Sequence, residues 1–403
     1  MSMNVLFLTL YRIDDIYKSG IYEDLLREFI KHNHNVYVVS PSERRYKEKT
    51  NLTESKNCHL LSVKTGNIQK TNFIEKGIST ILIEHQFKSA IKKYFSNVNF
   101  DLILYSTPPI TLVGVVKYVK NRDKAKTYLL LKDIFPQNAV DIDLMSKTGL
   151  KGLLYKYFRK KEKQLYSISD YIGCMSLANT EYLLNHNPEI NSSCVDVCPN
   201  CIEPIDMTLS DEEKKQMRLK YDLPLDKKIF VYGGNLGKPQ GIPFIIECLR
   251  SQKENNDVFF LIVGDGTEYI KLLDFVEKEK QPNVKLMNRL PREDYDRMVS
   301  ACDVGMIFLD HRFTIPNFPS RLLAYMQARL PVLAVTDPNT DIGKVITEGG
   351  FGLWCESNNV VEFSQCVSNL TKDNLNLLGE NSFDYLNKHF NVQKSYESII
   401  EKM

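Results

Sequence analysis

The chain has 403 residues, of which 43% are hydrophobic and 25% are charged. This length is too great for one ordinary core and indicates two domains of about 200 residues each, and the composition excludes a largely disordered chain. The net charge is only +2, but residues 1–200 hold 28 basic and 20 acidic side chains, whereas the remainder holds 24 and 30. A basic first half and an acidic second half predict different partners for the two domains. We expect no nucleic acid among these partners.

Apolar runs in the sequence have the length of strands and not of membrane spans. The run VFFLIVG at 258–264 is among the longest, and crossing a bilayer takes about 20 apolar residues. The first residues lack a basic segment, so we expect no signal peptide. Nine cysteines, an odd number, stand partly inside apolar runs. They favour reduced thiols packed as small hydrophobes, and the sequence therefore predicts a cytoplasmic protein.

The first half alternates apolar strand patterns with helical patterns. Strands are expected at residues 3–10, 35–40, 101–106, 126–131, 170–176 and 195–200. Helices are expected at residues 21–32, 81–95, 110–121, 150–167 and 177–186. This rhythm of strand, helix and strand predicts a parallel sheet covered on both faces.

The second half repeats the rhythm. Its strands are expected at residues 228–234, 258–264, 283–287, 303–309, 330–335 and 351–355, followed by two last helices at 374–389 and 391–402. The predicted fold class is therefore α/β, with two Rossmann-like doubly wound domains that face a ligand cleft. Pro204 disfavours helix just before it, and Ser210 with Glu213 forms a capping-box pattern, so the boundary is expected within 201–213.

A glycine-rich turn follows the first strand of the second half. The strand ends at Gly233 and Gly234, the turn carries Asn235, Gly237 and Lys238, and a helix begins shortly after. Glycines let the backbone approach a ligand, and the amides at the start of a helix attract anions. Lys238 adds a positive charge for a leaving phosphate. The same residues also fit an ordinary strand-to-helix turn with a solvated lysine, since the spacing is not that of a dinucleotide fingerprint.

A second segment, Pro319-Ser320-Arg321, opens a later helix. The backbone N–H groups of Ser320, Arg321 and Leu322 are predicted to hold a diphosphate, assisted by the Arg321 guanidinium. The alternative is that the serine simply caps the helix.

In order and spacing, these segments resemble the retaining GT-B glycosyltransferases of the large family that builds capsular, O-antigen and related bacterial polysaccharides (glycosyltransferase family 4-like). The resemblance spans nearly the whole chain, through the segments YKSGIYEDLLREFIKHNHNVYVVSP, LYSTPPI, LLLKDIFPQNAV, VYGGNLGKPQG, VGDGTEY and PNFPSRLLAYMQARLPVLA. It implies an acceptor-binding domain at 1–203, a nucleotide-sugar-binding domain at 204–380, and a C-terminal helix at 381–403 that returns to the first domain.

The resemblance further implies transfer with retention from a nucleotide-sugar donor, a UDP-sugar, to a lipid-linked or saccharide acceptor, without a metal ion or other cofactor. Lys238 and Arg321 are the expected catalytic cations, because a departing diphosphate leaves negative charge. Asp133 is the third catalytic candidate, beside the sugar, although an Asp after a strand also caps turns. The expected donor-binding residues are Gly20, Gly234, Asn235, Gly264, Asp265, Gly266, Arg289, Leu290, Pro319, Ser320, Arg321 and Leu322.

Several points stay open at this stage. Gly20 equally fits a structural glycine at a helix start, and Lys132 is a candidate contact of an acceptor pyrophosphate. Two glutamates that the family often carries fall on Pro316 and Ala324, so the ribose contact is undefined. Two rival functions are a non-hydrolysing UDP-sugar 2-epimerase of the same fold and a non-catalytic sugar-binding protein.

Two short motifs have metal or redox spacing but lack partners. Cys198 and Cys201 have no second pair of cysteines or histidines. Asp141 and Asp143 follow no suitable strand, so we expect no metal ligands in the chain.

The helix expected at 150–167 is amphipathic. Its apolar stripe is expected to face the core and consists of Leu150, Leu153, Leu154, Tyr157 and Phe158. Its other faces carry Lys151, Lys156, Arg159, Lys160, Lys161 and Lys163. We expect this basic face to attach the protein reversibly to the anionic inner face of the plasma membrane.

Overall fold

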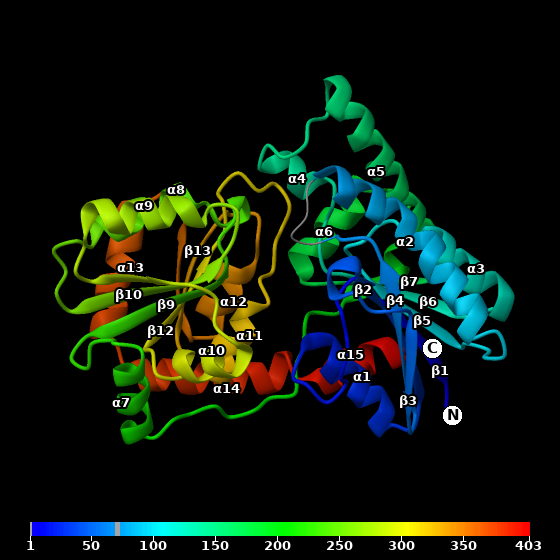
Figure 1. Cartoon of the computed structure of the whole chain (residues 1–403). Coiled ribbons are helices and arrows are strands. Elements are labelled where there is room, and N and C mark those ends of the chain that lie inside the picture. Colours follow the sequence, from blue (N-terminus) through cyan, green and yellow to red (C-terminus); the bar gives the residue numbers. More distant parts are fainter. Residues whose placement is uncertain (1, 69–72) are drawn as a thin grey trace. The chain divides into compact units, whose positions relative to one another are not determined.

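The computed structural model describes residues 2–68 and 73–403, which form two compact units (Figure 1). The first unit comprises Met1–Glu203 and Val392–Met403, and the second comprises Pro204–Asn391. The chain thus passes from one unit to the other where the sequence predicts a boundary. The expectation that the returning segment begins at residue 381 is wrong. Helix α14 (Leu375–His389) packs against α11 (Arg321–Gln327) inside the second unit, so the return begins only at Val392.

The first unit contains an eight-stranded sheet in the order β3-β4-β2-β1-β5-β6-β7-β8. All its neighbouring strands pair in parallel except β3 and β4, which form an antiparallel hairpin. The strands are β1 (Asn4–Leu8), β2 (Asn35–Glu43), β3 (Asn51–Ser55), β4 (Cys58–Thr65), β5 (Leu102–Ser106), β6 (Lys126–Leu131), β7 (Tyr171–Cys174) and β8 (Val195–Val197). The helices are α1 (Ile21–Lys31), α2 (Phe73–Tyr94), α3 (Val113–Asp123), α4 (Gln137–Asp141), α5 (Gly149–Ile168), α6 (Leu177–His186) and α15 (Val392–Ile400).

The second unit contains a six-stranded parallel sheet in the order β11-β10-β9-β12-β13-β14. Its strands are β9 (Lys228–Asn235), β10 (Val258–Asp265), β11 (Val284–Met287), β12 (Val304–Phe308), β13 (Val332–Thr336) and β14 (Gly352–Glu356). Its remaining helices are α7 (Asp211–Lys220), α8 (Ile242–Ser251), α9 (Tyr269–Glu279), α10 (Arg292–Val299), α12 (Ile342–Glu348) and α13 (Val360–Lys372). The strand order reverses between β9 and β12, and at such a switch point the loops after the strands separate and leave room for a ligand.

The parallel sheets confirm the predicted α/β fold of two Rossmann-like domains. The central strands of each sheet are buried because they are continuous apolar runs, and each unit has its own hydrophobic core. The capping box of Ser210 and Glu213 opens α7 as expected. All nine cysteines are free, and eight of them are buried.

Two expectations about the first unit need correction. The hairpin of β3 and β4 was not expected, because most of β3 is exposed and polar and shows no apolar alternation. The apolar stripe of α5 does not face the core throughout: Leu153, Leu154 and Tyr157 are exposed. The side chain of Leu150 lies outside the described part of the helix. None of the helices described is long and apolar enough to cross a membrane.

Candidate active site

The turn after β9 lies at the switch point of the second sheet. Gly234 has a φ of +131°, a backbone conformation that favours glycine, and it is exposed together with Asn235. The turn is braced from within. The Asn235 side-chain amide and the Gly237 N–H donate to Gln240 Oε1 over 3.0 and 3.2 Å, and the Tyr232 hydroxyl donates to the Asn235 carbonyl over 2.9 Å. These bonds fix the conformation of the exposed turn at the end of the strand.

Lys238 stands next in this turn, at the start of a short 3-10 helix (Lys238–Gln240). Its side chain is half-buried. Within the described ranges, its ammonium has no ion pair or side-chain hydrogen bond. Its ammonium can therefore approach an anion, and its role toward a leaving phosphate stays a prediction.

The end of β10 packs directly on the same turn. A Cβ on Gly264 would collide with the Gly234 carbonyl, and a Cβ on Gly266 would collide with the Leu236 backbone. The Leu236 N–H donates to the Asp265 carbonyl over 2.8 Å, which completes the contact. Both glycines thus have a structural reason, close backbone packing, independent of any ligand.

Arg321 joins the two segments predicted to bind the donor, because its side chain reaches from α11 to the turn after β9. Its guanidinium lies 4.3 Å from the centre of the Tyr232 ring, and a Cβ placed on Gly234 would stand 3.4 Å from its Nη2 atom. Its Nη1 atom is buried without a hydrogen-bond partner. No carboxylate of the described residues lies within ion-pair distance of it. Arg321 as a whole is half-buried, but a buried cationic N–H group without a partner is costly, so this arrangement indicates a place for an anion from outside the chain.

The start of α11 differs in part from expectation. The side chain of Ser320 is exposed and makes no capping hydrogen bond, so the capping alternative is not found. The N–H of Leu322 donates to the Pro319 carbonyl over 3.3 Å. The local turn already uses this donor, so a bond from the Leu322 N–H to a diphosphate stays a prediction. The N–H groups of Ser320 and Arg321 remain candidates.

Tyrosines support this centre, and the sequence reasoning missed them. The Tyr325 hydroxyl accepts from the Gly233 N–H over 3.3 Å and lies 3.0 Å from the Met306 carbonyl. Burial raises the pKa of Tyr325 to about 12, so it stays a protonated donor. The Tyr295 ring fills the space that a side chain on Gly233 would need. One signal was available: Tyr325 follows Arg321 by four residues, which places both on one helix face.

Arg289 and Leu290 lie between β11 and α10. Arg289 is exposed and Leu290 is half-buried. In the described part of the chain, Arg289 makes no ion pair or side-chain hydrogen bond. No contact found in the structure joins either residue to Arg321, so their role toward the donor stays a prediction.

Asp133 stands after β6 in the first unit. The Thr107 hydroxyl, at the end of β5, accepts from the Lys132 and Asp133 N–H groups over 3.0 and 3.2 Å. Asn138 donates to Asp133 Oδ1 over 2.7 Å. Burial raises the pKa of Asp133 to about 6, although the Asn138 hydrogen bond opposes the shift. A carboxyl group that titrates near neutral pH suits proton transfer, which keeps Asp133 a catalytic candidate.

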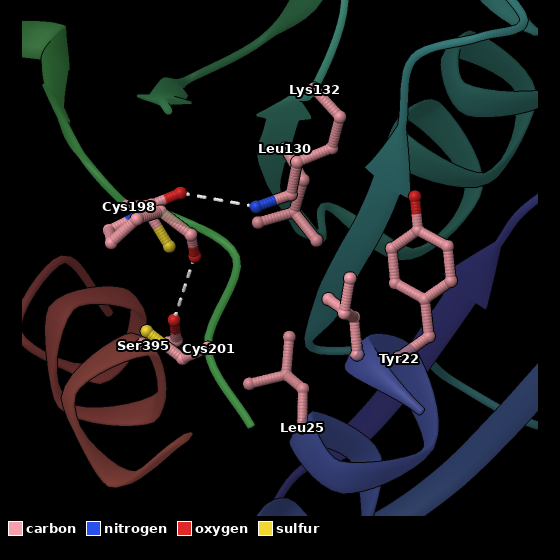
Figure 2. Close-up of a pocket in the computed structure, with 9 residues that line it drawn as sticks. Tyr22, Leu25, Leu130, Lys132, Cys198, Cys201 and Ser395 are labelled. Carbon is pink, nitrogen blue, oxygen red and sulfur yellow. Dashed lines mark hydrogen bonds between the residues drawn. The ribbon is translucent and has the colours of Figure 1, made fainter. Parts of the chain in front are cut away.

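Lys132, a candidate contact of an acceptor pyrophosphate, is instead bonded within the first unit. Its ammonium donates to the Cys198 carbonyl over 3.1 Å, and burial lowers its pKa. Figure 2 shows it in the wall of a small pocket within the first unit. The pocket is lined by Ile21, Tyr22, Leu25, Leu130, Lys132, Cys198, Pro199, Cys201 and Ser395. The lysine thereby ties β6 to the segment after β8, so it is engaged in the fold and not free for an acceptor pyrophosphate.

The two cysteines in this wall are unreactive in character. Burial raises the pKa of Cys201 to about 12 and also raises the pKa of Cys198. A protonated, buried thiol is neither a nucleophile nor a metal ligand. Among the residues that the structure describes, no three His, Cys, Asp or Glu side chains gather as a metal site.

Gly20 precedes α1 in the first unit. Its backbone is extended, but a Cβ there would collide with the Glu23 carboxylate. Its N–H donates to Asp24 Oδ1 over 3.1 Å. The structural alternative for Gly20 therefore has support, and its contact with a donor stays a prediction.

Comparisons with known proteins agree with this fold. A family model described as "Glycosyl transferases group 1" matches residues 213–383, which lie in the second unit. "Probable glycosyltransferase WbjE" of Pseudomonas aeruginosa is 24% identical over 82% of this chain and 80% of its own length. "Putative colanic acid biosynthesis glycosyl transferase WcaI" of Escherichia coli is 29% identical over 51% of this chain and 49% of its own.

Solved structures extend the likeness to the whole chain. The sucrose-phosphate synthase of Thermosynechococcus elongatus superposes with a TM-score of 0.76 at 14% identity, covering 99% of this chain and 98% of that one. HepE of Anabaena, in complex with UDP, gives a TM-score of 0.67 at 14% identity, covering 99% of both chains.

The fold is thus that of GT-B glycosyltransferases, two Rossmann-like α/β domains. The chain itself is a glycosyltransferase, and its second unit matches the group 1 domain. These matches favour the glycosyltransferase over the epimerase and the sugar-binding protein.

Proposed function

We propose that this glycosyltransferase moves a sugar from a UDP-sugar to a lipid-linked or saccharide acceptor, with retention of the anomeric configuration, in the synthesis of a bacterial surface polysaccharide. The observation that carries the proposal is the half-buried Arg321 side chain, whose buried Nη1 atom has no partner and which lies beside the exposed Gly234. A diphosphate supplies the negative charge and the acceptor oxygens that this cation lacks.

The names of similar proteins support the donor and the product. HepE of Anabaena has been solved with UDP and with UDP-glucose. An Escherichia coli structure with a TM-score of 0.74 holds UDP-2-fluoro glucose. WcaI is named for colanic acid biosynthesis. We extend these properties to the present chain as a hypothesis.

The proposed chemistry is electrostatic stabilisation of the leaving group. Cleavage of the bond between the sugar and the diphosphate leaves negative charge on the phosphate oxygens. Arg321 and Lys238 neutralise that charge in the second unit, and fixed cations of this kind act without reorganisation. We therefore propose that no metal ion or other cofactor is needed. Asp133, whose pKa lies at about 6, accepts the acceptor's proton or holds a sugar hydroxyl.

The protein is proposed to work in the cytoplasm, at the inner face of the plasma membrane. The first 200 residues carry the excess of basic side chains, and a lipid-linked acceptor presents its pyrophosphate at that surface. Anionic lipid attracts such a surface in a salt-dependent way.

The proposal is tested by incubating the protein with a panel of nucleotide sugars and measuring the release of nucleoside diphosphate. Slow release of UDP from one UDP-sugar, lost in Arg321→Ala, is the expected result. The anomeric configuration of the transferred sugar is then followed by proton NMR. Release from a non-uridine donor, or transfer with inversion, contradicts the corresponding part of the proposal.

A further inference from the structure

The outward face of α5 exposes large apolar side chains near its start. The exposed fractions are 65% for Leu153, 39% for Leu154 and 39% for Tyr157. The helix itself is well held further on, where Leu165 and Tyr166 are fully or nearly buried and the Tyr166 hydroxyl donates to Glu162 over 2.7 Å. Figure 1 shows the first turns of α5 projecting beyond the rest of the first unit. A rigid helix thus presents a small apolar patch to its surroundings.

Only some of the basic residues of α5 face outward with this patch. Arg159 is bound to Glu162 over 2.5 Å, and Lys163 is paired with Glu189 over 2.9 Å. By contrast, Lys151, Lys156 and Lys160 are exposed, and none has a hydrogen bond or ion pair within the described residues. The charge that the helix offers to a partner therefore comes from these three lysines.

The apolar side chains and two of the three lysines lie on one side of the helix, and Lys151 lies beyond Leu154 at the other edge of the patch. Leu153 and Tyr157 are four residues apart, and Lys160 follows three residues later, so the three lie along one face. Lys156 and Lys160, also four apart, run beside them. This is the arrangement of an interfacial helix, in which apolar side chains enter the acyl boundary while lysines reach lipid phosphates.

The segment before the helix holds this end in place. A Cβ on Gly152 would stand 2.6 Å from the Lys147 carbonyl oxygen, so the absence of a side chain lets the Lys147 backbone pack closely on the first turn. In this segment Leu144 is exposed as well. Its neighbour Asp143 already has a partner within the protein.

We propose that the first two turns of α5 insert Leu153, Leu154 and Tyr157 into the headgroup–acyl boundary of an anionic phospholipid leaflet, with Lys151, Lys156 and Lys160 on the lipid phosphates. The inference deepens the proposed function, and it rests on that function only for its purpose, which is to meet a lipid-linked acceptor. A lipid surface fits better than a protein partner, because lysines are depleted in protein interfaces, whereas lipid phosphates complement them.

Insertion of apolar side chains changes the expected dependence of membrane binding on salt. Attachment by charge alone disappears at about 0.5 M salt, where the Debye length falls to a few ångströms. Burial of apolar side chains is not screened, so a measurable fraction of the protein should stay bound at that salt concentration. Of the basic face expected from the sequence, Arg159 and Lys163 are already paired with Glu162 and Glu189 and contribute less to this attachment.

The test is co-sedimentation of the full chain with vesicles of phosphatidylcholine containing about 40% phosphatidylglycerol, and with vesicles of phosphatidylcholine alone. We expect binding to the anionic vesicles only, partly retained at about 0.5 M salt. The triple variant Leu153→Ser, Leu154→Ser, Tyr157→Ser should bind at least about tenfold more weakly at both salt concentrations. The variant Lys151→Gln, Lys156→Gln, Lys160→Gln should lose binding mainly at low salt.

A matched control uses three apolar side chains of the second unit with similar exposure, 58% for Ile270, 64% for Val361 and 57% for Leu377. Changing these to serine should leave vesicle binding unchanged. Wild-type binding by the α5 serine variant, or failure of the wild type to bind anionic vesicles at low salt, overturns the inference.

Depth and activity give independent readouts. The chain has one tryptophan, Trp354, so Tyr157→Trp adds a single reporter on α5. Its emission should shift to the blue and be quenched by brominated anionic lipid; unchanged emission on bound vesicles overturns insertion.

Release of UDP from the donor should be normal in the serine variant. Vesicle binding without any UDP release would refute the proposed function and leave this inference standing.

Discussion

Two arginines of the second unit show how the same side chain serves different purposes. Arg218, on α7, is nearly buried and fully engaged: its Nε donates to the Ala301 carbonyl over 2.9 Å and its Nη2 to Asp303 over 2.8 Å. Arg321, on α11, has a ring beside it, Tyr232, but its Nη1 atom has no hydrogen-bond partner. The hydrogen bonds of Arg218 are made within the protein and stabilise the fold. Arg321 has a donor without a partner, which is free to bind a ligand.

The difference separates stability from function. Removing a partner from a buried ion pair leaves the other charge uncompensated, while removing a cation that has no counter-ion relieves a cost. Substitution of Arg218 should therefore lower mainly the stability, and substitution of Arg321 should lower mainly the turnover.

Arg218→Ala should lower the free energy of unfolding of the second unit by about 3–5 kcal/mol, because Asp303 and three carbonyl groups lose their donor. Urea unfolding followed by circular dichroism measures it. The matched variant Arg321→Ala should change the same quantity by less than about 1 kcal/mol. Equal losses in the two variants would remove the distinction between the arginines.

Arg321→Ala should lower the turnover of donor by about 10²-fold or more, the scale for loss of one group that stabilises transition-state charge. Initial rates of UDP release at saturating donor measure it. Arg250→Ala is the control, because that guanidinium is already paired with Glu279 over 2.6 Å. Near-normal turnover without Arg321 would end its assignment as a catalytic cation.

The comparison also extends to two carboxylates of the first unit. Asp170 meets Lys120 over 2.8 Å; burial acts to raise its pKa, but the bonds to Lys120 and Thr127 outweigh this and leave the pKa lowered. Asp133 has no cation at ion-pair distance in the described residues, and burial raises its pKa to about 6. The ionised form is thus favoured in the fold for Asp170 and disfavoured for Asp133.

The sign of the pH dependence follows. Because the pKa of Asp133 is raised on folding, its ionisation lowers stability as pH rises from about 4 through 6. Asp133→Asn should therefore stabilise the first unit by on the order of 1 kcal/mol at pH about 7.5, with the gain vanishing below pH about 4. Asp170→Asn should destabilise it at pH about 7.5. Urea midpoints at the two pH values check both, and a loss of stability in Asp133→Asn at neutral pH would contradict the assigned shift.

The smallest expected effect is that of chelation. If Arg321 and Lys238 supply the positive charge, activity after treatment with EDTA should equal that of the untreated enzyme within error. UDP release before and after chelation measures it. Loss of activity with rescue by Mg²⁺ or Mn²⁺ would direct attention to Asp141 and Asp143 instead.

Much of the fold could be predicted from the sequence. Continuous apolar runs mark the buried parallel strands, and the structure places β6 and β9 within a residue of the expected limits. Exposed polar strands such as β3 carry no such pattern, so the hairpin was missed. The exposure of Leu153 could not be predicted either, because a helical stripe of apolar residues does not show where the core it packs against ends.

The candidate site was predictable only in part. The glycines and the Pro319-Ser320-Arg321 segment mark the loops of the switch point. The state of Arg321 was not predictable, since it depends on Tyr232, which is distant in sequence, and on the absence of a nearby carboxylate. The use of the Leu322 N–H by Pro319 likewise depends on the tightness of one turn.

Calorimetric titration of the wild type and of Arg321→Ala, with UDP and with uridine, tests directly whether Arg321 binds a diphosphate. A charged hydrogen-bond partner is worth about tenfold or more in affinity. We expect Arg321→Ala to weaken the binding of UDP by at least this factor and to leave the affinity for uridine unchanged. Unchanged UDP affinity, or an equal loss for uridine, would contradict it.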